Sequence, residues 1–462
     1  MGSVGSETAP LHGKSEIFSA FDDAATVSPF RRRAMIMVAL GEYLDGYDLI
    51  AIAGALLQLN SQFALTPSQT GLLGAAAFFG AAVGLLGAGS IADRIGRRRI
   101  FVHNFWLFAV LALISAFITG FGQLFVIRFL LGVAIGADIA ISIPFLAEIA
   151  PRKSRGKWAG ALPQIAWTLG AISSLAVAMA LIATVGDQAW RWLFGLGTVP
   201  ALIILAGRHG IPESPHWLLS QGRYAEAEEA MRAFGMDVSA SANVPPVSTD
   251  TAAPAQVAKS HGSFLDIFRA PYTRKAWLVM IVLGVGPLVG TAASVAAPYV
   301  FRFVGLMGPS AALSGSILIW VGGLVGSLIA LVTVERMGRI LSSAIAFFGM
   351  AICIIALILS INLPALFVTA YVLFGVCVWF GSSSNWLLPT ELLPAHLRAR
   401  AQGVGSGLSR VSGGITTWFI PTSIAAIGFA PTFSILAVMG AGLGVFILAH
   451  LSYETKGISL EI

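Results

Sequence analysis

Three acidic side chains lie close together in an apolar stretch near the start of the chain. Residues 41–56 read GEYLDGYDLIAIAGAL and contain Glu42, Asp45 and Asp48. A carboxylate can bind and release a proton, and a charge at bilayer depth is unfavourable unless it is paired or hydrated. Acids in such a stretch therefore indicate a function, and the chemistry that they favour is proton binding.

The composition of the chain shows which elements must hold these acids. Of the 462 residues, 56% are hydrophobic and 11% are charged, with a mean hydropathy of +0.83, whereas a soluble domain has about 25% charged residues. Apolar runs long enough to cross about 30 Å of hydrocarbon recur along the chain. Only helices satisfy their own backbone hydrogen bonds in such runs, and barrel strands would alternate in polarity over about ten residues. We predict an all-α polytopic membrane protein with twelve spans, at residues 34–60, 69–92, 99–120, 123–148, 158–184, 190–208, 274–303, 310–334, 340–360, 364–389, 399–427 and 430–451.

The positive charges are distributed unevenly among the loops. Of the 28 Lys and Arg residues, 24 fall in the N-terminal tail, the loops that follow even-numbered spans and the C-terminal tail. By the positive-inside rule, this pattern places both termini in the cytoplasm of a multi-pass protein of the cell (inner or plasma) membrane. The net charge of +6 therefore reflects topology and does not indicate a nucleic-acid partner. Cys353 and Cys377 both lie in spans, which indicates neither a disulfide framework nor a metal site.

A polar stretch divides the spans into two groups of six. Residues 237–262 are rich in Ala, Ser, Pro and Val without helical periodicity, which is typical of a flexible linker. Residues 223–235, just before it, are predicted to form a short helix. The predicted domains are a cytoplasmic tail at 1–33, a six-helix bundle at 34–208, a cytoplasmic linker at 209–273, a second six-helix bundle at 274–451 and a cytoplasmic tail at 452–462.

The two groups of spans repeat the same loop motifs at a nearly constant offset. Asp93 after span 2 aligns with Glu335 after span 8, and Glu148 after span 4 aligns with Glu391 after span 10. PESPHWL after span 6 and YETKGISL after span 12 form a third pair. Generic basic loops would explain the charges but not the registered acid, Pro and Gly positions, so we infer an internal duplication. Two similar bundles can rock about a site near the membrane midplane.

The loop motifs resemble those of a known family. D-R-x-G-R-R after span 2, R-x(3)-G-x(3)-G in span 4, AEIAP-x(3)-RG after it, PESP-x-WL after span 6 and TELLP-x(3)-RA after span 10 are similar to motifs of the major facilitator superfamily. Within that superfamily they look like the sugar-porter and metabolite–proton symporter branches, and the resemblance covers the whole chain. It implies two pseudo-symmetric six-helix bundles around a central cavity that opens alternately to either side of the membrane.

The same motifs imply a gate at the cytoplasmic face. Acids beside basic clusters at helix ends can form ion pairs between helices, and such pairs would hold one conformation of the transporter. The alternative is that the arginines serve only topology and contacts with lipid headgroups. The predicted gate residues are Asp93, Arg94, Arg97, Glu148, Arg155, Glu335, Arg336, Arg339, Glu391 and Arg398.

Asp48 and Arg128 are expected at matching depths in the membrane. At 1.5 Å per residue, Asp48 lies about 21 Å from the cytoplasmic start of span 1, and Arg128 in span 4 lies about 22 Å up. In the resembled family, the GYD of span 1 and the span-4 arginine form a proton-coupling pair, which implies that role here. Beside the guanidinium an aspartate stays ionised, whereas a broken pair in low dielectric lets it take a proton. The alternative is a permanent structural salt bridge.

Two further acids extend the predicted proton-coupling set. Asp45 lies one turn below Asp48, near the midplane, where it can face the cavity. Asp138 lies deep in span 4 and can serve as a second relay or pair with an arginine of a loop. Glu42 lies nearer the cytoplasmic interface, where solvation explains it as well as a function does.

Arg410 is the candidate for binding a substrate. It lies about 16 Å into span 11, near the depth of Asp45, and a buried guanidinium suits planar anions such as carboxylates. It can instead pair with Asp45 or Asp138. Aromatic residues in spans are more often packing or interfacial residues than ligand-binding ones. With that alternative, the further substrate-binding candidates are Gln164, Trp167, Tyr299, Trp379, Asn385 and Trp386.

A secondary active transporter is the function that these observations predict. Sugar porters carry a glutamine pair in span 7, and the stretch KAWLVMIVLGVGPLVGTAASVAAPYV here contains neither Gln nor Asn. The DGYD of span 1 resembles instead the carboxylate and aromatic-acid symporter branches. We therefore predict proton-coupled symport of a small organic acid or similar metabolite, by a functional monomer that needs no cofactor. The alternatives are a sugar porter and an exporter of amphipathic compounds. No nucleophile–base set, metal cluster or phosphate-binding loop indicates an enzyme.

Overall fold

The structure is a computed structural model, and it describes residues 27–95, 97–151, 156–220, 223–235, 267–295, 297–303, 309–393 and 395–455. Every regular element within these ranges is a helix. The first half contains α2 (Pro29–Phe63), α3 (Pro67–Ile95), α4 (Arg97–Ser115), α5 (Phe121–Ile149), the π-helix η2 (Gly156–Ala161), α6 (Leu162–Val185), the 3-10 helix η3 (Gly186–Gln188), α7 (Ala189–Leu196), α8 (Thr198–His209), α9 (Pro215–Ser220) and α10 (Tyr224–Ala233). The second half contains α11 (Thr273–Val295), α12 (Ala297–Phe303), α13 (Pro309–Met337), α14 (Arg339–Leu359), α15 (Pro364–Asn385), α16 (Leu388–Leu392), α17 (Ala395–Ile427), α18 (Phe429–Leu448) and the 3-10 helix η6 (Leu451–Tyr453).

The twelve predicted spans correspond to twelve helices or helix pairs. Span 5 begins in η2 and continues in α6, span 6 consists of α7 and α8, and span 7 consists of α11 and α12. Each of the other nine is one long helix. Span 10, predicted to continue to residue 389, ends at Asn385, because Pro389 has no amide hydrogen to extend the helix. Among the described residues, nine stretches are long and apolar enough to cross a membrane. Neither α2, which holds Glu42, Asp45 and Asp48, nor α17, which holds Arg410, is one of them.

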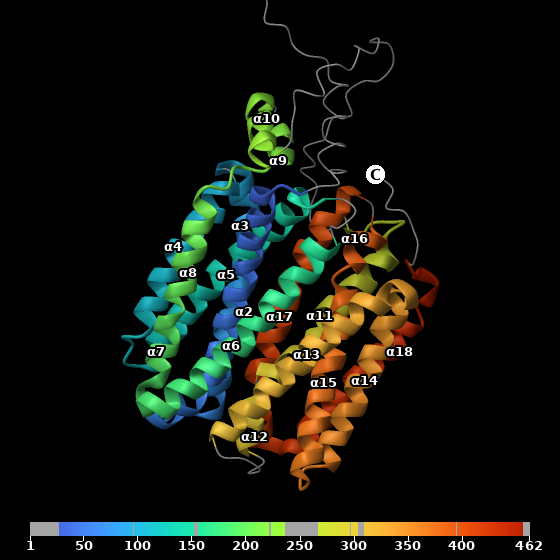
Figure 1. Cartoon of the computed structure of the whole chain (residues 1–462). Helices are drawn as coiled ribbons and strands as arrows, with labels where there is room; N and C mark the ends of the chain where they lie inside the picture. The colour runs from blue at the N-terminus through green and yellow to red at the C-terminus, as the bar shows by residue number, and fades with distance from the viewer. Residues whose placement is uncertain are drawn as a thin grey trace, which may run out of the picture.

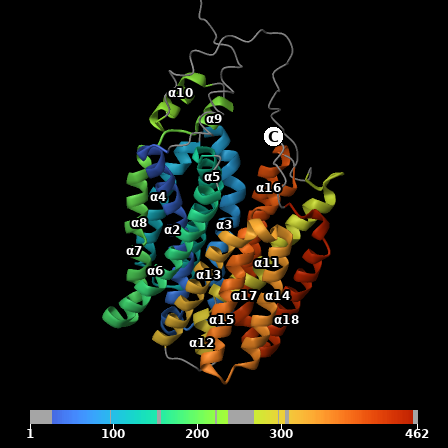
Figure 2. The same cartoon turned by 45° about the vertical axis from the view of Figure 1, so that its right-hand side comes forward.

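The helices form two bundles that stand side by side (Figures 1 and 2). One large cluster of buried apolar side chains belongs mainly to α2–α8, and a second belongs to α11–α18. In both views α9, α10 and α16 lie at one end of the molecule, here called the α10 end, and α12 lies at the other, here called the α12 end. The predicted arrangement of twelve helices in two six-helix bundles is confirmed, whereas the exact domain limits stay predictions.

Large apolar side chains cover much of the outer surface. Phe117, Leu359 and Val438 are each more than 70% exposed. Exposure of such side chains to water is unfavourable. The interior of a bilayer is as apolar as they are, so these side chains suit contact with lipid tails. This surface fits the membrane-spanning architecture.

The short predicted helix in the linker is α10, which packs on the start of α2. Ser28 accepts a hydrogen bond from the amide of Arg31 at 3.0 Å, and thereby caps α2. Its hydroxyl also donates to the carbonyl of Phe234 at 2.6 Å, directly after α10. The rings of Phe30 and Phe234 lie 5.9 Å apart. These contacts attach α10 to the first bundle.

Glycines allow the helices around the acidic residues to approach closely. A Cβ on Gly46 of α2 would lie 2.0 Å from the carbonyl oxygen of Trp167, and a Cβ on Gly132 of α5 would lie 2.1 Å from that of Ala77. Any side chain at these positions would force the helix pair apart, which is why small residues favour close packing in membranes. Gly46 therefore brings α6, with Trp167, beside the Asp45–Asp48 turn of α2.

The two bundles touch closely near the α12 end. The indole Nε1 of Trp418 in α17 donates to Ser68 Oγ at the start of α3, at 3.1 Å. A Cβ on Gly71 of α3 would lie 2.5 Å from the Trp418 carbonyl oxygen. On α13, Ser314 donates to the sulfur of Met179 in α6 at 3.4 Å. The structure is therefore closed between the bundles at the α12 end.

Candidate functional site

Asp48 and Arg128 form a buried ion pair within the first bundle. The guanidinium Nη1 of Arg128 donates to Asp48 Oδ1 at 2.8 Å, and its Nη2 donates to the Asp48 backbone oxygen at 2.7 Å. The side chain of Arg128 is fully buried and that of Asp48 is 6% exposed. The Arg128 guanidinium carbon also lies 5.3 Å from the ring centre of Phe194 in α7. The contact expected from the matching depths is present.

The pair is incompletely satisfied. Asp48 Oδ2 and Arg128 Nε are both sealed from solvent and have no hydrogen-bond partner. A buried polar atom without a partner costs about 1–3 kcal/mol, and native proteins contain few of them. The geometry thus leaves one carboxylate oxygen of Asp48 without a donor, at the place where a proton can bind.

Asp138 pairs with Arg208, which sequence analysis did not single out. Nη1 of Arg208, in the last turn of α8, donates to Asp138 Oδ1 at 2.6 Å and to Ser142 Oγ at 3.2 Å, and Nη2 donates to the Val38 carbonyl at 2.9 Å. Ser142 in turn donates to Asp138 Oδ1 at 2.7 Å. Both members of the ion pair are at most 1% exposed. The arrangement favours the structural alternative for Asp138, namely pairing with an arginine near a loop.

Gly41 makes room for this second ion pair. A Cβ at that position would lie 2.2 Å from Arg208 Nη2 and 2.5 Å from Asp138 Oδ2. The guanidinium also lies over the rings of Phe101 and Phe105, at 4.1 and 4.4 Å from their centres. Gly41, directly before Glu42 in the sequence, thus leaves the space into which Arg208 and Asp138 pack.

Glu42 and Asp45 are buried, and each has a carboxylate oxygen without a partner. Glu42 is 7% exposed and Asp45 is 1% exposed, so the solvated position considered for Glu42 is not what the structure shows. Glu42 Oε1 and Asp45 Oδ2 are sealed and receive no hydrogen bond. Arg410 on α17 lies within electrostatic range of both acids, but no ion pair joins it to either one. Arg410 therefore does not form the predicted pair with Asp45, and Asp138 is already paired with Arg208.

Three tryptophans meet where the bundles face each other. The ring centres of Trp167 in α6 and Trp320 in α13 lie 5.2 Å apart, those of Trp167 and Trp379 in α15 lie 5.2 Å apart, and the third pair is 5.8 Å apart. A Cβ on Gly323 would lie 2.3 Å from Trp379 Cδ1, so this glycine admits the indole. Trp167 and Trp379 were predicted, whereas Trp320 was missed among the aromatic residues of the spans.

The remaining substrate-binding candidates lie on α6, at the end of α15 and on α12. Gln164 lies on α6, one turn from Trp167. Asn385 ends α15 and accepts a hydrogen bond from Ser343 of α14 at 2.6 Å, within the second bundle, and Trp386 follows it. Tyr299 lies on α12, at the far end of the molecule from α16 (Figure 1). Their roles stay predictions.

The predicted gate residues that are described form contacts inside each bundle. Arg339 at the start of α14 donates through Nε to Glu391 Oε1 at 3.1 Å, and its Nη2 lies 3.0 Å from the same oxygen. The hydroxyl of Thr455 donates to the other oxygen of Glu391. In the first bundle, the hydroxyl of Ser214 donates to Glu148 in the same way. A gate that joins the two bundles stays a prediction.

Two acids that were aligned but not named as gate residues complete these networks. Glu213 Oε2 accepts from the amide of Arg98 near the start of α4, at 2.9 Å. Glu454 accepts from the amides of Arg339 and Ile340 at the start of α14, at 2.6 and 3.0 Å. A carboxylate at a helix N-terminus satisfies orphan amides and complements the helix dipole. The duplicated motif thus has the same structural role in both bundles.

Arg336, another predicted gate residue, is exposed at the end of α13. The six remaining gate residues lie beyond what the structure describes. Arg155 lies outside the described residues, and so do the side chains of Asp93, Arg94, Arg97, Glu335 and Arg398.

We expect the change of Glu391 to glutamine to loosen closure at the α10 end. The variant keeps the volume but removes the charge that Arg339 contacts, and a hydrogen bond to a charged group contributes about 1.5–3 kcal/mol. The readout is thiol labelling of Gly407→Cys, which is buried on α17 against Leu86 of α3, with Cys353 and Cys377 replaced by alanine. Labelling should rise up to about tenfold, since about 1.4 kcal/mol corresponds to a factor of ten.

The matched variant Glu148→Gln should act in the same direction, and Asp187→Asn, an exposed acid between α6 and α7, is the control. If labelling in both glutamine variants equals that in the control, these acids do not hold the gate.

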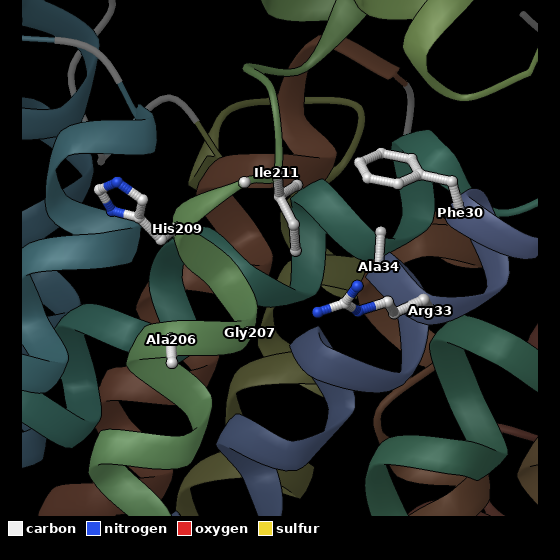
Figure 3. A pocket seen from close by; sticks show the side chains of 8 residues that line it. Phe30, Arg33, Ala34, Ala206, Gly207, His209 and Ile211 are labelled. Atoms are coloured by element: carbon white, nitrogen blue, oxygen red, sulfur yellow. The ribbon is translucent and has the colours of Figure 1, made fainter.

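A groove of about 180 Å³ opens at the α10 end between α2 and α8. Figure 3 shows Phe30 and Arg33 from α2 on one side of it, with Ala206 and His209 from α8 on the other. It contains none of the predicted site residues, so it is separate from the candidate site. Its lining residues are Phe30, Arg33, Ala34, Ala206, Gly207, His209, Gly210 and Ile211.

Comparisons with known proteins agree with this architecture. Residues 34–462 match a family model described as "Sugar (and other) transporter". The putative metabolite transport protein YaaU of Escherichia coli is 32% identical over 447 residues, with 95% of this chain and 96% of that protein covered. The arabinose-proton symporter of Bacillus subtilis is 28% identical, with 91% and 92% covered. A structure of the xylose transporter XylE from E. coli, in a partially occluded inward-open conformation, aligns with a TM-score of 0.77 at 21% identity, with 94% and 100% covered.

Proposed function

The chain belongs to the family of sugar and other transporters, and from that premise we propose that it moves a small polar metabolite together with protons by alternating access. It is a secondary transporter of the major facilitator superfamily, in the sugar-porter branch, and not an enzyme. It is a multi-pass membrane protein. Its substrates are a small molecule and protons.

The buried Asp48–Arg128 pair is the observation that carries the proposal of proton coupling. Two charges in low dielectric hold each other ionised while they touch. When movement of α2 relative to α5 shifts the guanidinium away, the carboxylate is left alone and binds a proton, because an isolated charge at that depth is unfavourable. The unpartnered Oδ2 of Asp48 is the acceptor for that proton. Substrate binding and bundle movement are thereby linked to protonation.

A small organic acid is the substrate class that the site favours. Among the described residues no hydrogen bond or ion pair engages the Arg410 guanidinium, which can therefore bind a carboxylate through two parallel donors. Trp167 and Trp379, at the face between the bundles, offer flat apolar surfaces to an unsaturated or cyclic acid. A screen of purified protein against organic acids, sugars and nucleosides tests this, because a ligand of the folded state raises the melting temperature.

A sugar is the second candidate substrate. It is favoured by the tryptophan cluster, since an aromatic face can pack against the apolar face of a sugar ring, and by relatives named as arabinose and glucose transporters. It is disfavoured by α11, which offers no amide side chain for sugar hydroxyls. Stabilisation by pentoses or hexoses and not by acids in the screen would select it.

The remaining proposals concern topology and assembly. We propose that the α10 end faces the cytoplasm, with both termini there. The positive-inside distribution of charge supports this, as does the position of α9, α10 and α16 at one end (Figure 1). Both of the bundles that alternating access needs are formed by this one chain, which supports a functional monomer.

The change of Arg410 to lysine is expected to weaken binding of the acid found in the screen by about 1.5–3 kcal/mol, the range for hydrogen bonds to charged groups. Lysine keeps the positive charge but loses the planar pair of donors that fits a carboxylate. Ligand affinity is measured beside the wild type, with melting temperature as the control for folding. Unchanged affinity would remove Arg410 from the binding site and favour a neutral substrate.

A further inference from the structure

The buried charges around α2 do not balance when all are ionised. Among the described residues, Asp48 is neutralised by Arg128 and Asp138 by Arg208, both through direct ion pairs. Two acids of α2 then remain, Glu42 and Asp45, and they face a single cation, Arg410 of α17. With both acids ionised, this group of three would carry a net charge of −1 in a setting where charge is costly.

Geometry makes full ionisation of the two acids more unfavourable still. Glu42 and Asp45 are three residues apart on one helix, so they lie on the same face. Both are more than 90% buried. Each has a sealed oxygen that accepts no hydrogen bond, and no ion pair joins Arg410 to either acid. Two carboxylates that share such a site cannot both ionise readily, and one of them takes up a proton.

We propose that Glu42 and Asp45 form a second proton-binding site, which holds one proton between the two carboxylates and is separate from Asp48. The reaction is the binding of one proton to one of the two carboxylates, which gives a carboxylic acid beside a carboxylate. That carboxylate balances Arg410, so the group of three becomes neutral. The proposal rests on the proposed function, because it assigns a second proton to the same transport cycle.

The charged neighbours of this site come from several helices. Asp138 on α5 and Arg208 on α8 form an ion pair in which each neutralises the other. Both residues also act on Asp45 electrostatically. Arg410 reaches it from the opposite bundle. Its distance from Glu42 and Asp45 must therefore change when the bundles rock, whereas the distance between Asp138 and Arg208, within one bundle, need not. When Arg410 is far from the two acids, the site can take up a proton, and when Arg410 is near, the site can release it.

Infrared difference spectroscopy of the full-length protein in lipid nanodiscs tests the proposal without a substrate, since the probe is the proton itself. A pH change from about 5 to about 9 should reveal the carbonyl band of a buried carboxylic acid, shifted in heavy water. The expected result is that Glu42→Gln and Asp45→Asn each remove one carboxylic acid from this signal. Asp48→Asn should leave it in place, and Asp187→Asn is the control for an exposed acid.

The proposal is overturned if the wild type shows no such band, or if the band survives in both Glu42→Gln and Asp45→Asn and is lost only in Asp48→Asn. Melting temperatures show whether each variant is folded, and the two single variants serve as independent tests. Failure here is distinguishable from failure of proton coupling, because coupling is judged from transport by Asp48→Asn and the second site from the infrared band.

Discussion

Replacement of Asp48 by asparagine is expected to abolish uphill accumulation of substrate while binding persists. Asparagine has nearly the same volume as aspartate and can still accept a hydrogen bond from Arg128, which donates to Asp48 at 2.8 Å. Asparagine cannot gain or lose a proton in the pH range of transport, so the proton gradient can no longer drive accumulation of the substrate. The variant should let substrate equilibrate or exchange, and should not concentrate it.

The measurement uses proteoliposomes with an imposed pH gradient and the radiolabelled ligand that the stability screen identifies. Accumulation by the wild type should collapse when a protonophore is added. The Asp48→Asn variant should show the collapsed level with or without the protonophore, and the control Asp187→Asn should behave as the wild type. Concentrative uptake by Asp48→Asn with normal protonophore sensitivity would disprove the coupling role of Asp48.

Replacement of Arg208 by methionine is expected to destabilise the protein by about 3–5 kcal/mol, the usual cost when one partner of a buried ion pair is removed. Arg208 is fully buried and donates to Asp138 and Ser142 as well as to the carbonyl of Val38. Without it, the carboxylate of Asp138 is left with one hydroxyl donor in an apolar setting. A marked fall in melting temperature, measured by scanning fluorimetry, is the readout.

The double variant Asp138→Leu with Arg208→Met distinguishes a structural pair from a relay. Removal of both charges often costs little or nothing, so the double variant should recover much of the lost melting temperature. If it also accumulates substrate against a gradient, Asp138 is not needed as a proton relay. A single Arg208→Met variant as stable as the wild type would mean that the ion pair does not hold α5 and α8 together.

The helices were more predictable than the sites because hydropathy indicates how deep a residue lies in the membrane. It does not indicate toward which neighbouring helix the side chain points. The twelve spans were recognised from apolar runs, and the depth of Asp48 and Arg128 followed from the fixed rise of a helix. Direction about the helix axis depends on which neighbours pack against each face. For that reason Glu42 could not be assigned from the sequence, whereas the structure buries it beside Asp45.

Partners on distant helices were the least predictable. Asp138 and Arg208 are 70 residues apart, and nothing in either local sequence pairs them. The position of Gly41 between them was informative only once α2, α5 and α8 were placed together. Trp320 likewise joins Trp167 and Trp379 because α6, α13 and α15 meet across the two bundles.

By itself, the sequence determined the number of spans, the duplication, the family resemblance and the matching depths of Asp48 and Arg128. These follow from hydrophobic length, motif spacing and helix rise, all of which are properties of the chain taken one segment at a time. The tertiary structure alone decided which charges are neutralised, which remain unbalanced and which aromatic rings touch. Those outcomes depend on helix rotation and close approach at glycines such as Gly41 and Gly46, because an ion pair or ring contact exists only when two packed faces bring its atoms within a few ångströms.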